Sequence, residues 1–256
     1  MERSFKGGLR FVAIQLTVWA GLYGLYLFVR GLAVERADAA FTHASQLIRL
    51  ERAGGLFHEA SVQDAVTSVK GLSKFFDLYY MLGFGPLLLL ALIWLAWRHR
   101  TAYRELRSAM LISLALASIP FVLYPTAPPR LISGLGIADT VGLAGHDAGS
   151  FAGIRFDPYA AMPSMHVGWT LLLSLVGYRL TRNRLIKILL VAHAVLMTLA
   201  VTATGNHFFV DAAAGSAIAL LGYALISCRA LRLFRGSHPA RARLLGAGRC
   251  VAPEAA

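Results

Sequence analysis

Six apolar stretches divide the chain, and each is close to the length that crosses a bilayer. A transmembrane helix needs about 20 mostly apolar residues to span roughly 30 Å of hydrocarbon. The stretches lie at about residues 11–30, 76–97, 107–124, 164–181, 185–204 and 208–228. They predict an all-α fold, an integral membrane bundle of six transmembrane helices with both termini on the same side of the membrane.

The segments around these stretches complete the predicted organisation. Residues 1–30 form a first transmembrane anchor, because their apolar run exceeds the ~7–15 residues of a signal peptide. Residues 31–75 mix apolar and charged positions as amphipathic helices on a membrane surface do, so we expect an interfacial connection, with a lipid-access or homodimer surface as the alternative. Residues 76–228 form a five-helix core, and residues 229–256 form a basic cytoplasmic tail without fixed structure.

Composition supports a membrane protein and argues against nucleic acid as a partner. The 256 residues are 57% hydrophobic and 15% charged, whereas soluble domains have about 25% charged residues. The formal net charge is +12, but the basic residues form short clusters between the apolar stretches, as topology signals do. Cys228 and Cys250 show no spacing typical of a metal or redox pair.

The distribution of Lys and Arg predicts the orientation. In the six-span arrangement one side carries 17 of them: three before the first stretch, four in 98–107, four in 179–187 and six in the tail. The other side carries eight, six in 30–74 and two in 125–163. The positive-inside rule then places both termini in the cytoplasm. We expect a multi-pass protein of the plasma membrane, and the many Arg and Ala residues are typical of a GC-rich bacterial genome.

Three short segments place polar and ionisable residues at the predicted outer ends of the apolar stretches. They are Tyr-Pro-Thr-Ala-Pro-Pro-Arg at 124–130, Ala-Met-Pro-Ser-Met-His at 161–166 and Thr-Gly-Asn-His-Phe-Phe-Val-Asp at 204–211. Because all three face outward in the predicted topology, we expect them to meet in one cavity.

The segment at 204–211 carries a candidate nucleophile. His207 and Asp211 are four residues apart at the start of an apolar stretch, and this spacing puts them on one face of a helix. A carboxylate there can accept the imidazole N–H, fix the tautomer and leave the other nitrogen to attack. An unpaired Asp near the membrane is costly, which favours a functional pair over a structural contact.

The segment at 161–166 predicts a helix start with a candidate acid. Pro163 suits the first turn of a helix, and the N–H groups of Ser164, Met165 and His166 would then point out of its end as an anion site. The near-neutral pKa of an imidazole suits His166 to protonate a leaving alkoxide and then deprotonate an incoming hydroxyl. A plain helix cap is the alternative.

The segment at 124–130 ends in a candidate phosphate ligand. Its prolines prevent a continued helix and hold Arg130 just beyond the third stretch, and a guanidinium presents a planar fork of donors to phosphate oxygens. Arg155 is a second candidate; either arginine alone could instead be a topology signal. With Ser164 and Asn206 these residues form the expected phosphate-binding set, and the three segments together predict phosphoryl transfer. We expect no cofactor.

The three segments resemble the type-2 phosphatidic acid phosphatase superfamily of membrane lipid phosphatases over roughly residues 45–225. The motif sequences are similar to those of the branch that contains inositol phosphorylceramide synthases. The resemblance implies a two-step, metal-independent mechanism in which His207 becomes transiently phosphorylated, Asp211 orients it and His166 acts as acid and then base. It also matches Arg130 to the arginine of the family's first motif.

Two departures from the family pattern bear on this assignment. The first motif commonly has a lysine seven residues before its arginine, where this chain has Leu123, and the phosphatase branch has an arginine six residues before its histidine, where this chain has Val201. The missing cations favour a transferase-like branch in which Arg155 or groups of the substrate complete the site. The expected partners are a lipid phosphate, the bilayer, and water or an alcohol as acceptor.

Other functions use the same residues or different ones. His166, His207 and Asp211 could form a metal facial triad, and a vanadate-dependent oxidase shares this kind of site. A transporter or scaffold would instead use the ionisable residues His193 and Asp77. The lipid, which could be phosphatidate, a polyprenyl phosphate or an inositol lipid, is not specified by these patterns.

Overall fold

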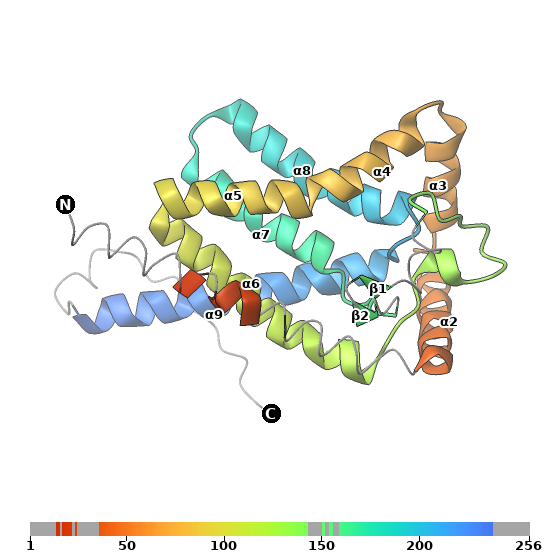
Figure 1. The fold of residues 1–256 in the computed structure, drawn as a ribbon, viewed down its shortest axis with the longest axis horizontal. Helices are drawn as coiled ribbons and strands as arrows, with labels where there is room; N and C mark the ends of the chain where they lie inside the picture. The colour runs from red at the N-terminus through yellow and green to blue at the C-terminus, as the bar shows by residue number, and fades with distance from the viewer. Residues whose placement is uncertain are drawn as a thin grey trace.

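The computed structural model describes residues 14–15, 17–21, 24, 36–142, 150–151, 154–155 and 159–237, and these are almost entirely helical (Figure 1). The helices are α2 (Ala37–Ala53), α3 (Glu59–Ser68), α4 (Leu72–Gly83), α5 (Gly85–Arg98), α6 (Arg100–Leu123), α7 (Met165–Leu180), α8 (Arg184–Ala203) and α9 (Phe209–Ser237), with a 3-10 turn η1 (Pro129–Leu131). A two-residue hairpin pairs β1 (Ser150–Phe151) with β2 (Ile154–Arg155) in antiparallel register. The prediction of an all-α membrane fold is confirmed at this level.

Four helical segments among the described residues are long and apolar enough to cross a membrane. They are Leu72–Arg98, Arg100–Leu123, Arg184–Ala203 and Phe209–Ser227. Helix α7 has 16 residues and coincides with the fourth predicted stretch. The stretch predicted at 11–30 lies mostly outside the described residues, so the number of six spans and the orientation stay predictions.

Several predicted boundaries were wrong. The second span begins at Leu72 and is interrupted at Phe84, between α4 and α5, where Pro86 begins the new helix without needing an N–H donor. Helix α6 begins at Arg100 rather than near 107, because Tyr103 and Leu106 are buried in the core on its first turns. Helix α9 continues to Ser237, into the segment expected to lack fixed structure.

Glycines bring the central helices unusually close together. Helix α9 packs along both α6 and α7, and α7 packs along α8. A Cβ on Gly168 of α7 would lie 2.6 Å from the carbonyl oxygen of Gly215 on α9, and a Cβ on Gly215 would collide with the Ser164 backbone. Small residues that let backbones approach are the usual means of packing transmembrane helices.

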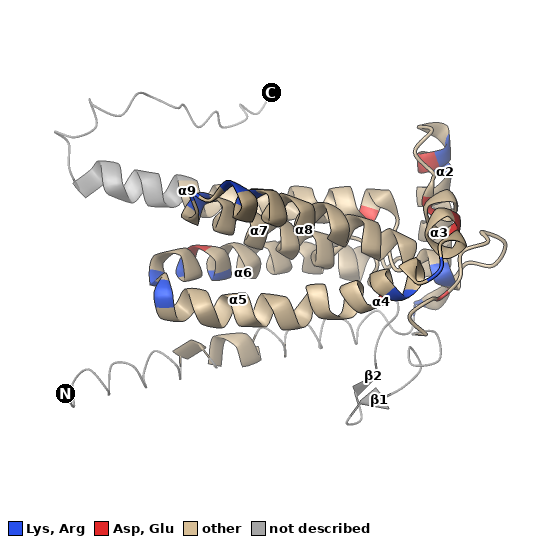
Figure 2. Ribbon diagram, turned by 90° about the horizontal axis from the view of Figure 1, so that it is seen from above, with Lys and Arg blue, Asp and Glu red and all other residues tan. Residues whose placement is uncertain are grey.

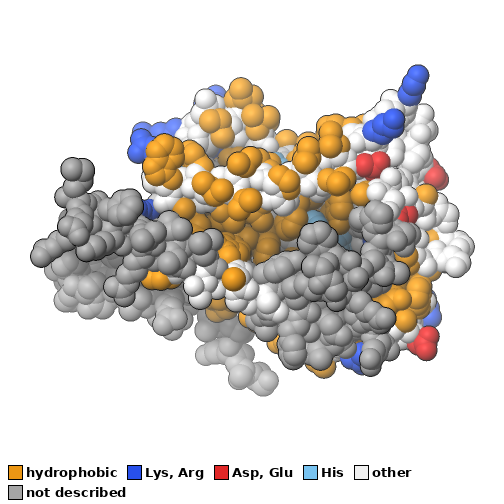
Figure 3. All heavy atoms as spheres, viewed as in Figure 1, with side chains coloured by type: hydrophobic (Ala, Val, Ile, Leu, Met, Phe, Trp, Pro, Cys, Tyr) orange, Lys and Arg blue, Asp and Glu red, His pale blue; other side chains and the backbone are white. Residues whose placement is uncertain are grey.

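The surface of the bundle separates apolar and charged side chains. Figure 3 shows hydrophobic side chains over α4, α5 and α8, with Lys and Arg at both ends of the molecule and acidic residues at the right-hand end. Large apolar side chains such as Trp97 and Leu90 are 83% and 64% exposed. Figure 2 shows basic side chains at the turn between α5 and α6 and beside α7, α8 and α9 at one end of the bundle. An exposed apolar band between charged ends fits a bilayer.

Helices α2 and α3 lie at the opposite end, with α2 running across the direction of the bundle (Figure 1). The buried face of α2, formed by Ala40, Ala44, Leu47 and Ile48, packs against Ala127 and Phe208. Helix α3 contacts α8 and α4. Both helices therefore cover the end of the bundle where the three polar segments are located.

Candidate active site

Backbone hydrogen bonds tie the three polar segments to one another. Thr126 N–H donates to Tyr159 O (2.6 Å) and Ala161 N–H donates to Thr126 O (3.2 Å), which joins the first segment to the second. Ser164 N–H donates to Asp211 O (2.9 Å), and Arg130 N–H donates to Gly205 O (3.0 Å). Each segment is thus bonded to both others, and the structure brings them together as the sequence predicted.

His207 is held through one ring nitrogen. Its Nδ1 lies 2.8 Å from the carbonyl oxygen of Ala161 and 3.5 Å from Asp211 Oδ2, and the residue is 5% exposed. A carbonyl only accepts, so Nδ1 carries the proton and Nε2 keeps its lone pair. The tautomer is the one predicted for a nucleophile, but the shorter contact that fixes it comes from Ala161 rather than from Asp211.

Asp211 is fully buried, and its carboxylate contacts both the backbone N–H of Phe208, at the start of its own helix, and the ring of His207. Its Oδ2 accepts the backbone N–H of Phe208 at 2.9 Å, while the same oxygen lies 3.5 Å from His207 Nδ1. The carboxylate therefore sits beside the N-terminus of α9, where negative charge is favoured. One oxygen couples the ring of His207 to the first turn of the helix.

His166 stands opposite His207 on the first turn of α7. The two ring centroids are 5.6 Å apart. The other face of the His166 site is aromatic, with the rings of Phe84 and Tyr80 centred 4.3 Å and 4.9 Å away. Two imidazoles at this separation, one on the first turn of α7 and one just before α9, can address opposite sides of one phosphorus atom.

Ser164 caps α7 and is less available to a ligand than the sequence indicated. The helix begins at Met165, so Pro163 precedes the cap rather than lying in the first turn. Ser164 Oγ lies 3.5 Å from Val167 N, and its backbone N–H is bonded to Asp211 O. The predicted anion site at this helix end is therefore reduced to the backbone N–H groups of Met165 and His166.

Arg130 is anchored to the third segment by its side chain as well as its backbone. Its Nη1 donates to Asn206 Oδ1 at 2.5 Å, and Asn206 Nδ2 donates to Thr204 Oγ1 at 2.8 Å. Gly205, between them, has φ +70°, and a Cβ there would lie 3.0 Å from Arg130 Cβ and 2.9 Å from Ile137 Cγ2. Only glycine suits this position, because a side chain there would push Arg130 away from the turn at 204–206.

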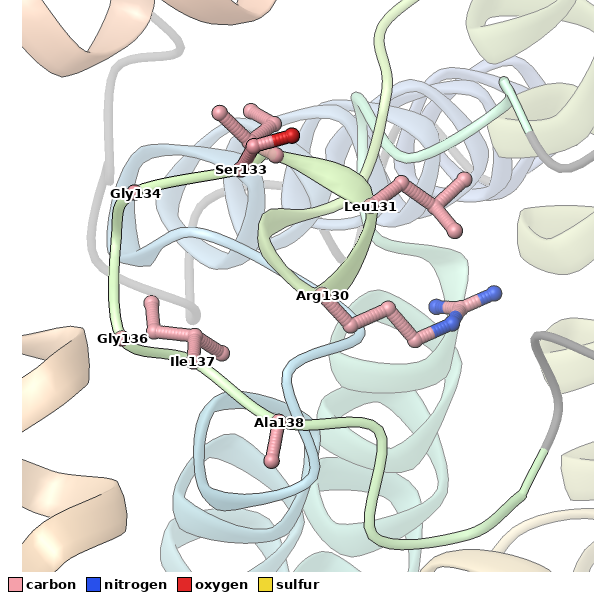
Figure 4. A pocket seen from close by; sticks show the side chains of 8 residues that line it. Arg130, Leu131, Ser133, Gly134, Gly136, Ile137 and Ala138 are labelled. Atoms are coloured by element: carbon pink, nitrogen blue, oxygen red, sulfur yellow. The ribbon is translucent and has the colours of Figure 1, made fainter.

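The loop after Arg130 lines a cavity of about 330 Å³ (Figure 4). Its walls are formed by residues 130–138, including Ser133, Gly134 and Gly136. Figure 4 shows the Arg130 side chain extending away from Gly134 and Gly136. The cavity adjoins the arginine but is built mostly from loop backbone.

The two positions where family cations are missing differ in their surroundings. Leu123 is 67% exposed at the end of α6, whereas Val201 is fully buried and its carbonyl accepts the N–H groups of Asn206 and His207. A cation at position 201 would have to replace a packed core side chain. Arg155 lies in β2, and its side chain is outside the described part of the structure.

Three polar residues of α2 and α3 reach the site and were missed in the sequence. Glu59 Oε1 accepts the N–H of Phe209 (2.9 Å), and Glu51 Oε1 accepts the N–H of Val210 (2.7 Å). Gln63 Nε2 donates to Ala138 O (2.8 Å) and Ala203 O (2.9 Å). In the sequence these side chains resemble the polar face of a surface helix. The one signal that could have identified the two glutamates is that neither has a Lys or Arg three or four residues away on its helix.

The two residues that a transporter or scaffold would use, His193 and Asp77, each have a hydrogen-bond partner nearby. Tyr79 Oη lies 2.5 Å from His193 Nδ1, and Thr140 Oγ1 donates to Asp77 Oδ1 at 2.6 Å. His193 is thus a buried, hydrogen-bonded histidine of the core. Within the described ranges, no group of three or more His, Cys, Asp or Glu side chains is arranged to hold a metal ion.

Comparison with known proteins identifies the family. No curated protein sequence matches the chain. Among solved structures, the crystal structure of Aquifex aeolicus LpxE is similar in fold, with a TM-score of 0.51 and 19% sequence identity over 67% of this chain and 93% of that chain. The family model of the PAP2 superfamily matches residues 45–225, which include all three polar segments. The chain therefore belongs to the PAP2 superfamily.

Proposed function

We propose that the protein transfers the phosphoryl group of a lipid phosphate to His207 and then to water or an alcohol. Membership in the PAP2 superfamily and a fold like that of LpxE support a phosphatase acting on lipid phosphates. The observation that carries the mechanism is the ring of His207, whose Nδ1 faces Ala161 O and whose Nε2 is left to attack.

In the first step, Nε2 of His207 attacks phosphorus as the bond from phosphorus to the lipid oxygen breaks. His166 gives its proton to the departing alkoxide, and the Nδ1 proton of His207 stays on the bond to Ala161, with Asp211 stabilising the positive ring. In the second step, His166 takes a proton from water, the oxygen attacks phosphorus, and the P–N bond breaks. Inorganic phosphate leaves and both histidines return to their initial state.

Arg130 supplies the positive charge for the transferred group. The hydrogen bond to Asn206 fixes the orientation of the planar guanidinium, so that Arg130 can meet phosphate oxygens without a large loss of side-chain freedom. We propose that Asn206 contributes to phosphate binding by holding Arg130 in place, and that Arg155 supports Arg130. The backbone N–H groups at the start of α7 supply the remaining contacts to the phosphate. No metal is needed in this scheme.

The proposed site faces away from the cytoplasm. Residues 98–107, around the turn between α5 and α6, and residues 179–187, around the turn between α7 and α8, contain four Lys or Arg each. Both turns lie at the end of the bundle opposite the site. In this arrangement residues 1–30 anchor the chain, residues 31–75 lie at the outer interface, and the lipid tail occupies the bilayer beside the core 76–228. The lipid phosphate then reaches His207 at the interface.

The acceptor decides between two activities that use the same residues. Water gives a phosphatase, and an inositol hydroxyl gives the transfer expected of an inositol phosphorylceramide synthase-like branch. His207, Asp211 and His166 have the same roles in both.

The proposal is tested by phosphate release from a panel of lipid phosphates by purified protein in detergent with excess chelator, comparing wild type with His207→Ala. We expect release by wild type, none by the variant, and no effect of the chelator, with inositol added in parallel to detect transfer. Loss of activity with the chelator would favour the metal alternative. Equal turnover by both proteins would contradict the role of His207.

A further inference from the structure

Three successive backbone N–H groups at the start of α9 each meet a buried carboxyl group. Phe208 N–H donates to Asp211 Oδ2, Phe209 N–H to Glu59 Oε1 and Val210 N–H to Glu51 Oε1, at 2.9, 2.9 and 2.7 Å. The Glu51 and Glu59 residues are 2% and 0% exposed. The N-terminus of a helix leaves such donors unbonded, and here two other helices supply the acceptors.

The two glutamates also meet each other. The second oxygens, Glu51 Oε2 and Glu59 Oε2, are both buried, and as carboxylate oxygens, which only accept, neither has a hydrogen-bond partner among the described residues. Burial, with the neighbouring Glu59 and Asp211, raises the pKa of Glu51 from 4.5 to about 8. At neutral pH Glu51 therefore keeps its proton, which it can donate to Glu59.

We propose that Glu51 and Glu59 are positioning residues for the phosphoryl transfer: by accepting two successive backbone N–H groups, they fix the first turn of α9 and thereby the ring of His207. This inference rests on the proposed function of His207. The turn they hold is the one whose Phe208 N–H bonds to Asp211, and Phe208 itself is fully buried against α2. Helices α2 and α3 are thus part of the catalytic apparatus rather than only a connection.

The pair has a consequence for pH dependence. The titratable groups that face Glu51 in the described structure are Glu59 on α3 and Asp211 on α9, with His207 beside Asp211. Above about pH 8 Glu51 loses its proton, so it can no longer donate to Glu59, and it adds negative charge to the buried acidic cluster. We expect kcat to fall as the pH rises through this value.

The same shift sets the sign of the effect on stability. Between pH 4.5 and about 8 the folded protein retains a proton on Glu51 that the unfolded chain has lost. The free energy of unfolding therefore falls over this window and is independent of Glu51 above it.

The test compares Glu51→Gln, Glu51→Ala and the control Asp64→Asn, which alters an exposed carboxyl group of α3. An amide at position 51 can accept from Val210 and donate to Glu59 without titrating. We expect Glu51→Gln to keep near wild-type kcat at neutral pH and to lose the decline near pH 8. Glu51→Ala leaves the Val210 N–H without its acceptor and should lower kcat by about 10- to 100-fold with little change in KM, as a small misplacement of a nucleophile does. Asp64→Asn should match wild type throughout.

A second readout does not depend on turnover. Infrared difference spectra of wild type across pH 6 to 9 should contain the band of a protonated carboxyl group that disappears near the pKa of Glu51, about 8, and Glu51→Gln should lack this band. The inference is overturned if this band is absent, if Glu51→Gln keeps the wild-type pH profile, or if Glu51→Ala retains full kcat. If wild type has no activity on any lipid phosphate, the proposed function fails, while the infrared band still decides whether Glu51 keeps its proton at neutral pH.

Discussion

At the scale of single residues, His207 and His166 are distinguished by their contacts. The Nδ1 of His207 is fixed by a backbone carbonyl in a site that is 5% exposed, whereas His166 packs between aromatic rings and faces His207. A nucleophile needs a fixed tautomer, and an acid that later acts as a base needs to exchange its proton. The assignment of roles follows from this difference.

This assignment predicts how the loss of His166 depends on the leaving group. His166→Ala should lower kcat by about 10²- to 10⁴-fold for natural lipid phosphates, whose alkoxides need a proton. Phenolic esters with activated leaving groups should lose much less in the first step. Steady-state rates on both substrates, with single-turnover rates to isolate that step, provide the measurement. Equal losses on both would argue against a general acid.

Arg130 gives a second prediction at this scale. Arg130→Lys keeps the charge but cannot bond to Asn206 and phosphate with the same planar fork. We expect kcat/KM to fall by about 10-fold or more, since a hydrogen bond to a charged group contributes about 1.5–3 kcal/mol. A matched Arg179→Lys variant, at an exposed ion pair with Glu105, should remain fully active. Full activity of Arg130→Lys would make Arg130 a topology residue.

At the scale of elements, the site depends on how closely α7 approaches α9. Ser164 begins α7, Asp211 lies in the first turn of α9, and their backbone bond is possible because Gly215 has no side chain to separate them. The placement of His166 opposite His207 is therefore set by a helix contact.

Gly215→Ala tests this dependence. The added methyl group would meet the Ser164 backbone, which cannot move as a flexible side chain can, so we expect a loss of about 1–3 kcal/mol in stability together with reduced kcat. Thermal unfolding in detergent and phosphate release measure the two effects. In the control Gly85→Ala, the new Cβ has no neighbour within 4 Å, and both quantities should be unchanged. An unaffected Gly215→Ala protein would refute the close-packing argument.

The sequence predicted the elements that hydropathy defines and missed those that depend on distant partners. The stretches at 185–204 and 208–228 agree closely with α8 and the apolar part of α9. The prediction that the three polar segments meet followed from their common side of the membrane, and the structure confirms it. The roles assigned to their side chains stay predictions.

Glu51 and Glu59 show why some residues of the site could not be predicted from the sequence. Each is separated from its hydrogen-bond partner on α9 by about 150 residues of chain, and local periodicity assigns an acidic residue of an amphipathic helix to solvent. The early start of α6 was missed for a similar reason. Its basic residues look like a loop until Tyr103 and Leu106 are seen in the core.

At the scale of the whole molecule, the account requires the site to face away from the cytoplasm. In a background lacking Cys228 and Cys250, a cysteine at Ser133 beside the site should react with a membrane-impermeant maleimide in intact cells. A cysteine at the exposed Thr101, near the start of α6, should react only after permeabilisation. The reverse pattern would invert the proposed topology.

The most direct test of the central claim is to trap the phosphorylated enzyme. Wild type and His207→Ala would be mixed with a radiolabelled lipid phosphate, quenched in alkali to preserve the acid-labile P–N bond, digested and sequenced by mass spectrometry. The account predicts label on His207 of the wild type, chased away by further incubation, and an unlabelled variant that is still folded and membrane-inserted. Phosphate release without a labelled protein, or label on His166 instead, would contradict it.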